Sequence, residues 1–243
     1  MRYSFGKPIV LSRYERGPQP LMCFSAEADL ATGIVVGAVG IYALCHVGKR
    51  HQIPLAATPL LLAIHEIDES FVWWGLRGQV SLPIEHAAIY VFLAVAFVLP
   101  FWVPFAMLGV ESRVHRRDWM KAFLAVGTIT SVALLVAVFR GPVGASIDGS
   151  HIAYTANISY AGILIALYIV ATCGSCLVAS NRWLVLLGLA NLGAVIALGW
   201  ITFTGFTSLW CAWAALTSLA IAIYLRRSGR TSAPVGMSYA GSS

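Results

Sequence analysis

Charged residues are scarce in this chain. They make up 11% of its 243 residues, whereas a typical soluble domain has about 25%. Hydrophobic residues make up 59% of the sequence. This composition excludes an ordinary soluble domain and predicts an all-α, polytopic integral membrane helix bundle, with the lipid bilayer as its main partner and the cell membrane as its location.

Signatures of several enzyme classes are also missing. The sequence has no phosphate-binding loop, no nucleophile elbow and no H-E-x-x-H metal motif. The last apolar run has neither lysine nor histidine. This excludes a retinal Schiff base of the rhodopsin type and argues against seven-helix zinc hydrolases that use a late histidine pair. Whether the protein is an enzyme is therefore left open, and the sequence favours a protein that is not an enzyme.

Cysteine is restricted to five positions, which do not form the disulfide framework of a small secreted domain. Cys23 and Cys211 are expected at the external face, where they form a disulfide or, with His86 and His151, bind a divalent metal such as zinc or copper. The C-x-x-C of residues 173–176 is either redox-active or a point of close helix packing.

Seven apolar runs each approach the ~20 residues needed to cross a bilayer. Ser25 is suited to cap the first helix, because acidic residues follow in its first turn. Pro100 and Pro104 are expected to kink the end of the third. The seven-helix transmembrane domain occupies residues 22–227, and a disordered cytoplasmic tail follows over 228–243. The predicted spans are 26–47, 54–76, 83–107, 119–139, 152–179, 183–204 and 207–225.

The basic residues predict an orientation. Seven spans place ten of the 16 lysines and arginines on one side and six on the other, or two if the chain starts at Met22. By the positive-inside rule the first side is cytoplasmic, so the carboxy terminus is cytoplasmic and the amino terminus outside. Residues 1–21 are then a disordered or over-extended amino-terminal segment, or an exported leader. Because the net charge of +6 arises from short loops, nucleic acid is excluded as a partner. The ten residues are Lys49, Arg50, Arg113, Arg116, Arg117, Lys121, Arg182, Arg226, Arg227 and Arg230.

Four ionisable residues interrupt the second apolar run: His65, Glu66, Asp68 and Glu69. At about 100° per residue they form a stripe roughly 160° wide. The opposite arc is apolar and suits lipid or apolar neighbours. Ionisable residues at bilayer depth usually mark a functional site, and these are predicted to bind a proton or cation. The alternative is a polar stripe buried for structure alone.

Other polar side chains are expected at the same, outer half of the bundle. They indicate a water-filled vestibule that is closed toward the cytoplasm. The alternative is that interfacial residues are polar in any membrane protein. These residues are Glu27, Asp29, Glu85, His86, Asp148, His151, Tyr154, Asn157, Thr202, Thr204, Ser208 and Trp210.

Four short motifs carry a family resemblance: M-C-F-S-A at 22–26, I-H-E-I-D-E-S-F-V-W at 64–73, D-G-S-H-I-A-Y at 148–154 and S-L-W-C at 208–211. Together they resemble an uncharacterised family of bacterial seven-helix membrane proteins whose members begin with the same pentad. The resemblance implies the bacterial inner membrane and Met22 as the start, but no activity. His65 and Glu69 match the family's second-helix motif, whereas Glu66 and Asp68 depart from it.

Three functions remain open. The first is transport or sensing, in which Glu69 is the main titrating group, His65 its proton partner, and Glu66 and Asp68 auxiliary. The second is a membrane-embedded metal-dependent or thiol-redox enzyme. The third is a structural or partner-binding membrane protein.

Overall fold

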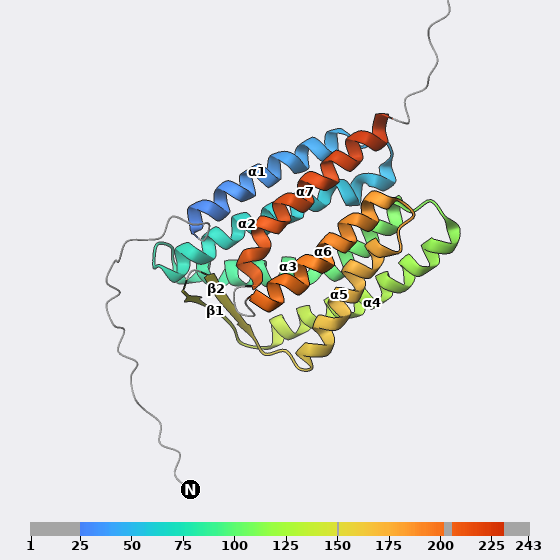
Figure 1. The fold of residues 1–243 in the computed structure, drawn as a ribbon. Helices are drawn as coiled ribbons and strands as arrows, with labels where there is room; N and C mark the ends of the chain where they lie inside the picture. The colour runs from blue at the N-terminus through green and yellow to red at the C-terminus, as the bar shows by residue number, and fades with distance from the viewer. Residues whose placement is uncertain (1–24, 150, 202–205, 231–243) are drawn as a thin grey trace, which may run out of the picture.

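The computed structural model of the protein describes residues 25–149, 151–201 and 206–230, and is mostly α-helical. Within these ranges it has seven α-helices, one 3-10 turn and one two-stranded antiparallel sheet (Figure 1). The elements are α1 (Ala26–Cys45), η1 (Arg50–Gln52), α2 (Ile53–Leu76), α3 (Leu82–Val110), α4 (Val114–Arg140), β1 (Val143–Asp148), β2 (His151–Ala156), α5 (Ala161–Leu177), α6 (Arg182–Ile201) and α7 (Phe206–Arg230).

Three helices of the described chain, α1, α3 and α4, are long and apolar enough to cross a membrane. α2 has 24 residues, enough for about 36 Å of helix, but it carries the acidic stripe. Large apolar side chains such as Ile34, Ile129 and Phe139 are exposed on the outer faces of the bundle. Such faces suit contact with lipid.

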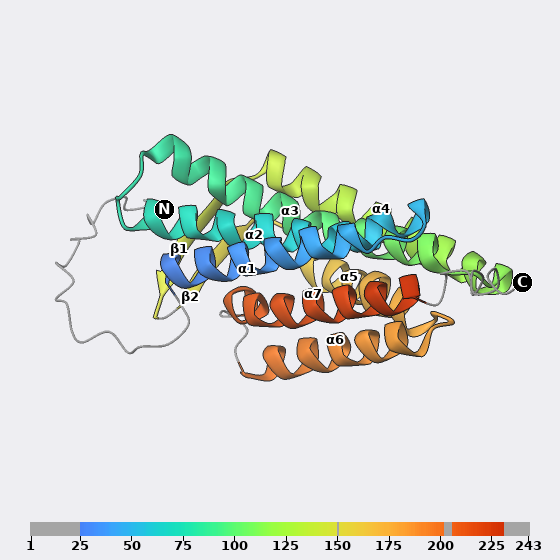
Figure 2. The ribbon, with the colours of Figure 1, turned by 90° about the horizontal axis from the view of Figure 1, so that it is seen from above.

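Successive helices run in opposite directions (Figure 1). One end of the bundle, here called the hairpin end, holds the start of α1, the end of α2, the start of α3 and the β1–β2 hairpin. The other, here called the basic end, holds the loops around Lys49 and Arg113 and the two arginines of α7, Arg226 and Arg227 (Figures 1 and 2). The start of α1 and the end of α7 lie at opposite ends, as an odd number of helices requires.

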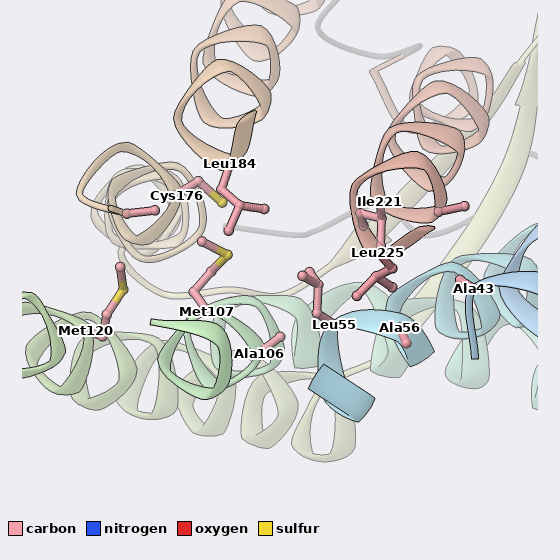
Figure 3. Close-up of a cluster of buried hydrophobic side chains, with 12 residues drawn as sticks. Ala43, Leu55, Ala56, Ala106, Met107, Met120, Cys176, Leu184, Ile221 and Leu225 are labelled. Atoms are coloured by element: carbon pink, nitrogen blue, oxygen red, sulfur yellow. The ribbon is translucent and has the colours of Figure 1, made fainter. Parts of the chain in front are cut away.

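Each end of the bundle has its own cluster of buried side chains. At the basic end, Met107 and Cys176 lie close to Leu184 of α6, and Leu225 of α7 lies above Leu55 and Ala56 of α2 (Figure 3). At the hairpin end, Trp73 and Phe92 pack with Ile152 of β2. The hairpin is therefore part of the core and not an external loop.

The hairpin departs from the all-α expectation. A helix was predicted from residue 152, but β2 occupies His151–Ala156 and α5 begins only at Ala161. Asp148 pairs with His151, which leaves a two-residue turn, and Gly149 has a φ of 61°. Glycine at the first position of this turn favours it, because glycine adopts positive φ without strain.

Other predicted boundaries are close to those observed. Ser25 caps α1, since its Oγ accepts a hydrogen bond from the Ala28 amide at 3.3 Å. α7 continues to Arg230, three residues into the segment predicted as tail. Residues 1–21 and 231–243 lie outside the described residues, so the predictions for them are not tested.

α3 continues through both prolines, and a neighbouring helix supplies a donor to one of the two carbonyls that they free. Proline has no N–H, so Pro100 and Pro104 leave the carbonyls of Ala96 and Pro100 without their helical donors. The Tyr168 hydroxyl of α5 donates to Ala96 O at 3.1 Å. Gly127 of α4 lies directly against Pro100 O. Such compensation by adjacent helices is how prolines are tolerated inside membrane helices.

At the basic end, one carboxylate joins two loops. Glu111 Oε1 accepts hydrogen bonds from Ser180 Oγ at 2.6 Å and the Arg113 amide at 2.8 Å, and its Oε2 accepts one from the Ser180 amide at 2.7 Å. Burial acts to raise the pKa of Glu111, but the bonds from Ser180 and Arg113 outweigh it and hold the pKa below its ordinary value.

Replacing Glu111 by glutamine is expected to lower stability at neutral pH by about 1–3 kcal/mol, because donors around a charged acceptor lose their partner. A depressed pKa contributes stability above the ordinary value, and that contribution is lost as pH falls through the folded value. The difference in melting temperature between wild type and variant should therefore shrink below about pH 4. Asp118→Asn is the control, since this carboxylate is exposed and pairs with the exposed Lys121. A difference that stays constant with pH would contradict the interpretation.

Candidate functional site

The acidic stripe of α2 faces the interior of the bundle. Glu66 and Glu69 are fully buried, with 0% of either residue exposed, and His65 is 6% exposed. The opposite arc has Ile64 and Phe71 exposed, at 52% and 38%. Helical periodicity predicted that the ionisable side chains face the bundle interior and the apolar arc faces outward, and these residues do so.

Glycines of α1 allow a close approach beside the stripe. A Cβ on Gly33 would lie 2.6 Å from Ile67 Cγ1 and 3.1 Å from Glu66 Cβ. Separations this short exclude any larger side chain unless the helices move apart. Small residues at helix interfaces permit this kind of backbone approach in membranes. Glu66 is consequently covered by α1 at this level of the bundle.

An aromatic stack connects the stripe to the hairpin. The His65 ring stacks on Phe92 of α3 with ring centres 4.0 Å apart, and Phe92 stacks on Tyr154 of β2 at 4.1 Å. Phe92 has no exposed surface. His65 Nε2 is buried and has no hydrogen-bond partner in the described protein. The stack holds the His65 ring against α3 and leaves this nitrogen without a partner among the described residues.

A second acid approaches from α1. Asp29 is 6% exposed and faces the indole of Trp73, which is 2% exposed, although Trp73 Nε1 does not reach hydrogen-bond geometry. The guanidinium of Arg77 lies 4.9 Å from the centre of the Trp73 ring. Trp73 therefore separates a buried acid from a cation at the end of α2, one helical turn beyond Glu69.

Asp68 lies at the edge of the stripe. The residue is half-buried, and its Oδ2 is buried without a hydrogen-bond partner in the described protein. Burying such an oxygen is unfavourable unless it is protonated or meets a ligand or water. The auxiliary role of Asp68 stays a prediction.

The remaining predicted site residues do not gather around α2. His86 is exposed on α3, and His151 is half-buried on β2 with Nε2 3.8 Å from Asp148 Oδ2. Cys23 and the side chain of Cys211 lie outside the described residues, so their disulfide and their metal role stay predictions. In the described ranges, no group of three or more His, Cys, Asp or Glu side chains is placed to hold a metal ion.

The C-x-x-C pair lies away from the stripe. Cys173 and Cys176 are buried free thiols of α5. A Cβ on Gly188 of α6 would come within 2.7 Å of Cys176 Cβ, and one on Gly174 within 2.6 Å of the Phe123 ring. The close-packing interpretation of this motif agrees with these contacts.

The open vestibule predicted beside the stripe is partly filled. Ile152 of the hairpin is fully buried, and Tyr154 stacks above Phe92. Sequence reasoning missed Phe92, because one phenylalanine in a long apolar run gives no signal. It also missed the hairpin, although the Asp148-Gly149 pair gave one.

Comparison with known proteins agrees with the resemblance seen in the motifs. No curated protein and no solved structure matches the chain. A family described as of unknown function, DUF6629, matches residues 22–236. This match includes the acidic stripe, the hairpin and every helix described above. The chain therefore belongs to the DUF6629 family of unknown function.

Proposed function

We propose that this protein is a seven-span membrane protein that binds a proton, a cation or a small solute at the acidic stripe of α2, in transport or in sensing. The observation that carries the proposal is the complete burial of Glu66 and Glu69 inside the bundle. An ionised side chain near the bilayer centre costs about 3 kcal/mol, so such residues are kept where they have a use.

The surroundings of the stripe support proton exchange. Glu69 and His65 lie one helical turn apart on the same face, as a carboxyl and an imidazole that share a proton would. Asp29 supplies a further buried carboxyl near Trp73. The site lies toward the hairpin end, which is the external side if the basic end is cytoplasmic.

This proposal includes the orientation predicted from the loops, with the amino terminus outside. The ten basic residues of the predicted cytoplasmic set belong to the loops and helix ends of the basic end. Access to the stripe would then pass beside the hairpin. The second candidate, a metal or redox enzyme, has no supporting contact among the described residues.

The test is a pH titration of tryptophan fluorescence, from about pH 4 to about pH 10, on the purified protein in detergent. Trp73 lies one turn from Glu69 and reports on charge at the stripe. Wild type is expected to show a titration step that Glu69→Gln removes, because glutamine keeps the shape but cannot ionise. Glu27→Gln, which changes an exposed carboxyl at the same end, should keep the step.

The same variants separate transport from sensing when reconstituted into liposomes that contain a pH-sensitive dye. Transport predicts proton flux in wild type and none in Glu69→Gln, whereas sensing predicts the fluorescence step without flux. If Glu69→Gln titrates like wild type, the stripe is structural and the proposal fails.

A further inference from the structure

A groove of about 360 Å³ lies between α6 and α7 at the basic end. The helices are joined nearer their middle, where Asn191 Oδ1 accepts hydrogen bonds from Trp213 Nε1 and Thr217 Oγ1. Beyond this contact the groove opens, and α6 and α7 lie side by side along one side of the bundle (Figure 2). The groove is separate from the acidic stripe, which lies in the half of α2 nearer the hairpin end.

The inner part of the groove is apolar. Leu184 and Ile221 form its floor and belong to the buried cluster of the basic end, where Figure 3 shows them on the two facing helices. Leu187, Ala220 and Ile223 line its walls. A slot of this kind, on the outer surface of a membrane bundle, has the chemistry of a hydrocarbon chain.

The outer part of the groove is cationic and aromatic. The guanidinium of Arg227 lies 5.0 Å from the centre of the Trp183 ring, and that of Arg182 lies 5.9 Å from it. Neither arginine has a carboxylate partner in the part of the chain that the structure describes. Asn181 and Ser228 complete the rim with polar side chains. Two unpaired positive charges over an apolar slot complement an anion that carries a hydrocarbon tail.

Two other arginines of this end, Arg116 and Arg117, are already bound within the protein. Arg116 donates to the carbonyls of Val178 and Ala179 at 2.8 and 2.7 Å. Arg117 donates to those of Leu108 and Glu111 at 3.1 and 2.9 Å. These guanidiniums bind the ends of α5 and α3, whereas Arg182 and Arg227 remain available to a ligand.

We propose that the groove between α6 and α7 binds one anionic phospholipid, with its phosphate between Arg227 and Arg182 and an acyl chain along Leu184, Leu187 and Ile221. Trp183 and Tyr224 line the groove at the basic end, and aromatic side chains are enriched where membrane proteins meet lipid headgroups. The site would hold lipid wherever the basic end faces an anionic leaflet.

Native mass spectrometry of the purified full-length protein tests this proposal. Incubation with phosphatidylglycerol should give a bound-lipid peak that phosphatidylcholine of the same acyl chains does not give. Arg227→Gln should weaken phosphatidylglycerol binding about fivefold, the effect of one basic residue near a membrane surface. Arg113→Gln removes an equal charge from the same end, away from the groove, and should leave binding unchanged.

Ala220→Leu tests the acyl slot separately. Ala220 is exposed and lines the groove, so leucine should occupy the slot and reduce lipid binding without loss of the helix. Equal binding of phosphatidylcholine, an equal loss in Arg113→Gln, or displacement of the lipid by millimolar inorganic phosphate would each overturn the proposal. The last result would identify a free anion as the ligand.

Discussion

Replacing Gly127 by alanine is expected to remove about 3 kcal/mol or more of stability, or to prevent recovery of folded protein. A Cβ at this position would overlap Pro100 O, a backbone atom that cannot rotate away, and would lie 2.6 Å from Pro100 C and 3.3 Å from Ala171 Cβ. α4 would have to separate from α3 and α5 together.

The measurement is the melting temperature and the yield of monodisperse protein after detergent extraction. A fall of about 6–12 °C corresponds to this loss in a chain of this size. Gly162→Ala in α5 is the matched control, because a Cβ there meets no atom within 4 Å. Alanine favours helix by about 1 kcal/mol over glycine, so the control should be neutral or slightly stabilised. Equal behaviour of the two variants would refute the close-approach argument.

The second large effect is expected for Phe92→Ala. Phe92 is fully buried between the His65 and Tyr154 rings and packs with Ile152 of the hairpin. Its truncation leaves a cavity and should cost about 3–5 kcal/mol. Because the same ring joins the hairpin to the acidic stripe, the variant should also loosen residues 143–156.

Hydrogen exchange followed by mass spectrometry measures this second effect. Peptides from β1 and β2 should exchange faster in Phe92→Ala, while peptides from the basic end should not change. Phe139→Ala is the control, since Phe139 is 71% exposed near the hairpin end of α4. If both variants exchange alike, the aromatic stack does not hold the hairpin.

The two large predictions concern different kinds of contact. Only the contact at Gly127 involves a feature that the sequence had indicated, the prolines of α3. Pro100 and Pro104 were expected to kink α3, since proline removes helical donors wherever it occurs. That Tyr168 would donate to the freed Ala96 carbonyl, and that Gly127 would pack against Pro100 O, was not predictable, because both residues come from other helices. The position of a proline in the sequence identifies the carbonyl that loses its helical donor, but only the packing of the helices identifies what contacts that carbonyl.

The hairpin shows a different limit. Ile152–Ala156 is apolar and continuous with the run that forms α5, so hydropathy alone extends the helix to it. Asp148-Gly149 and the alternation of β2 favour a turn and a strand. Here the local signal was present, and a longer apolar pattern outweighed it.

By itself, the sequence predicted apolar helices long enough to cross a membrane, the approximate extent of the helices and the inward direction of Glu66 and Glu69. These follow from hydrophobicity and from a 3.6-residue period, which are local properties. Only the tertiary structure decided that His65 meets Phe92, that Asp29 faces Trp73 and that the hairpin covers this end. Such neighbours depend on how distant helices pack, and no short stretch of sequence encodes that packing.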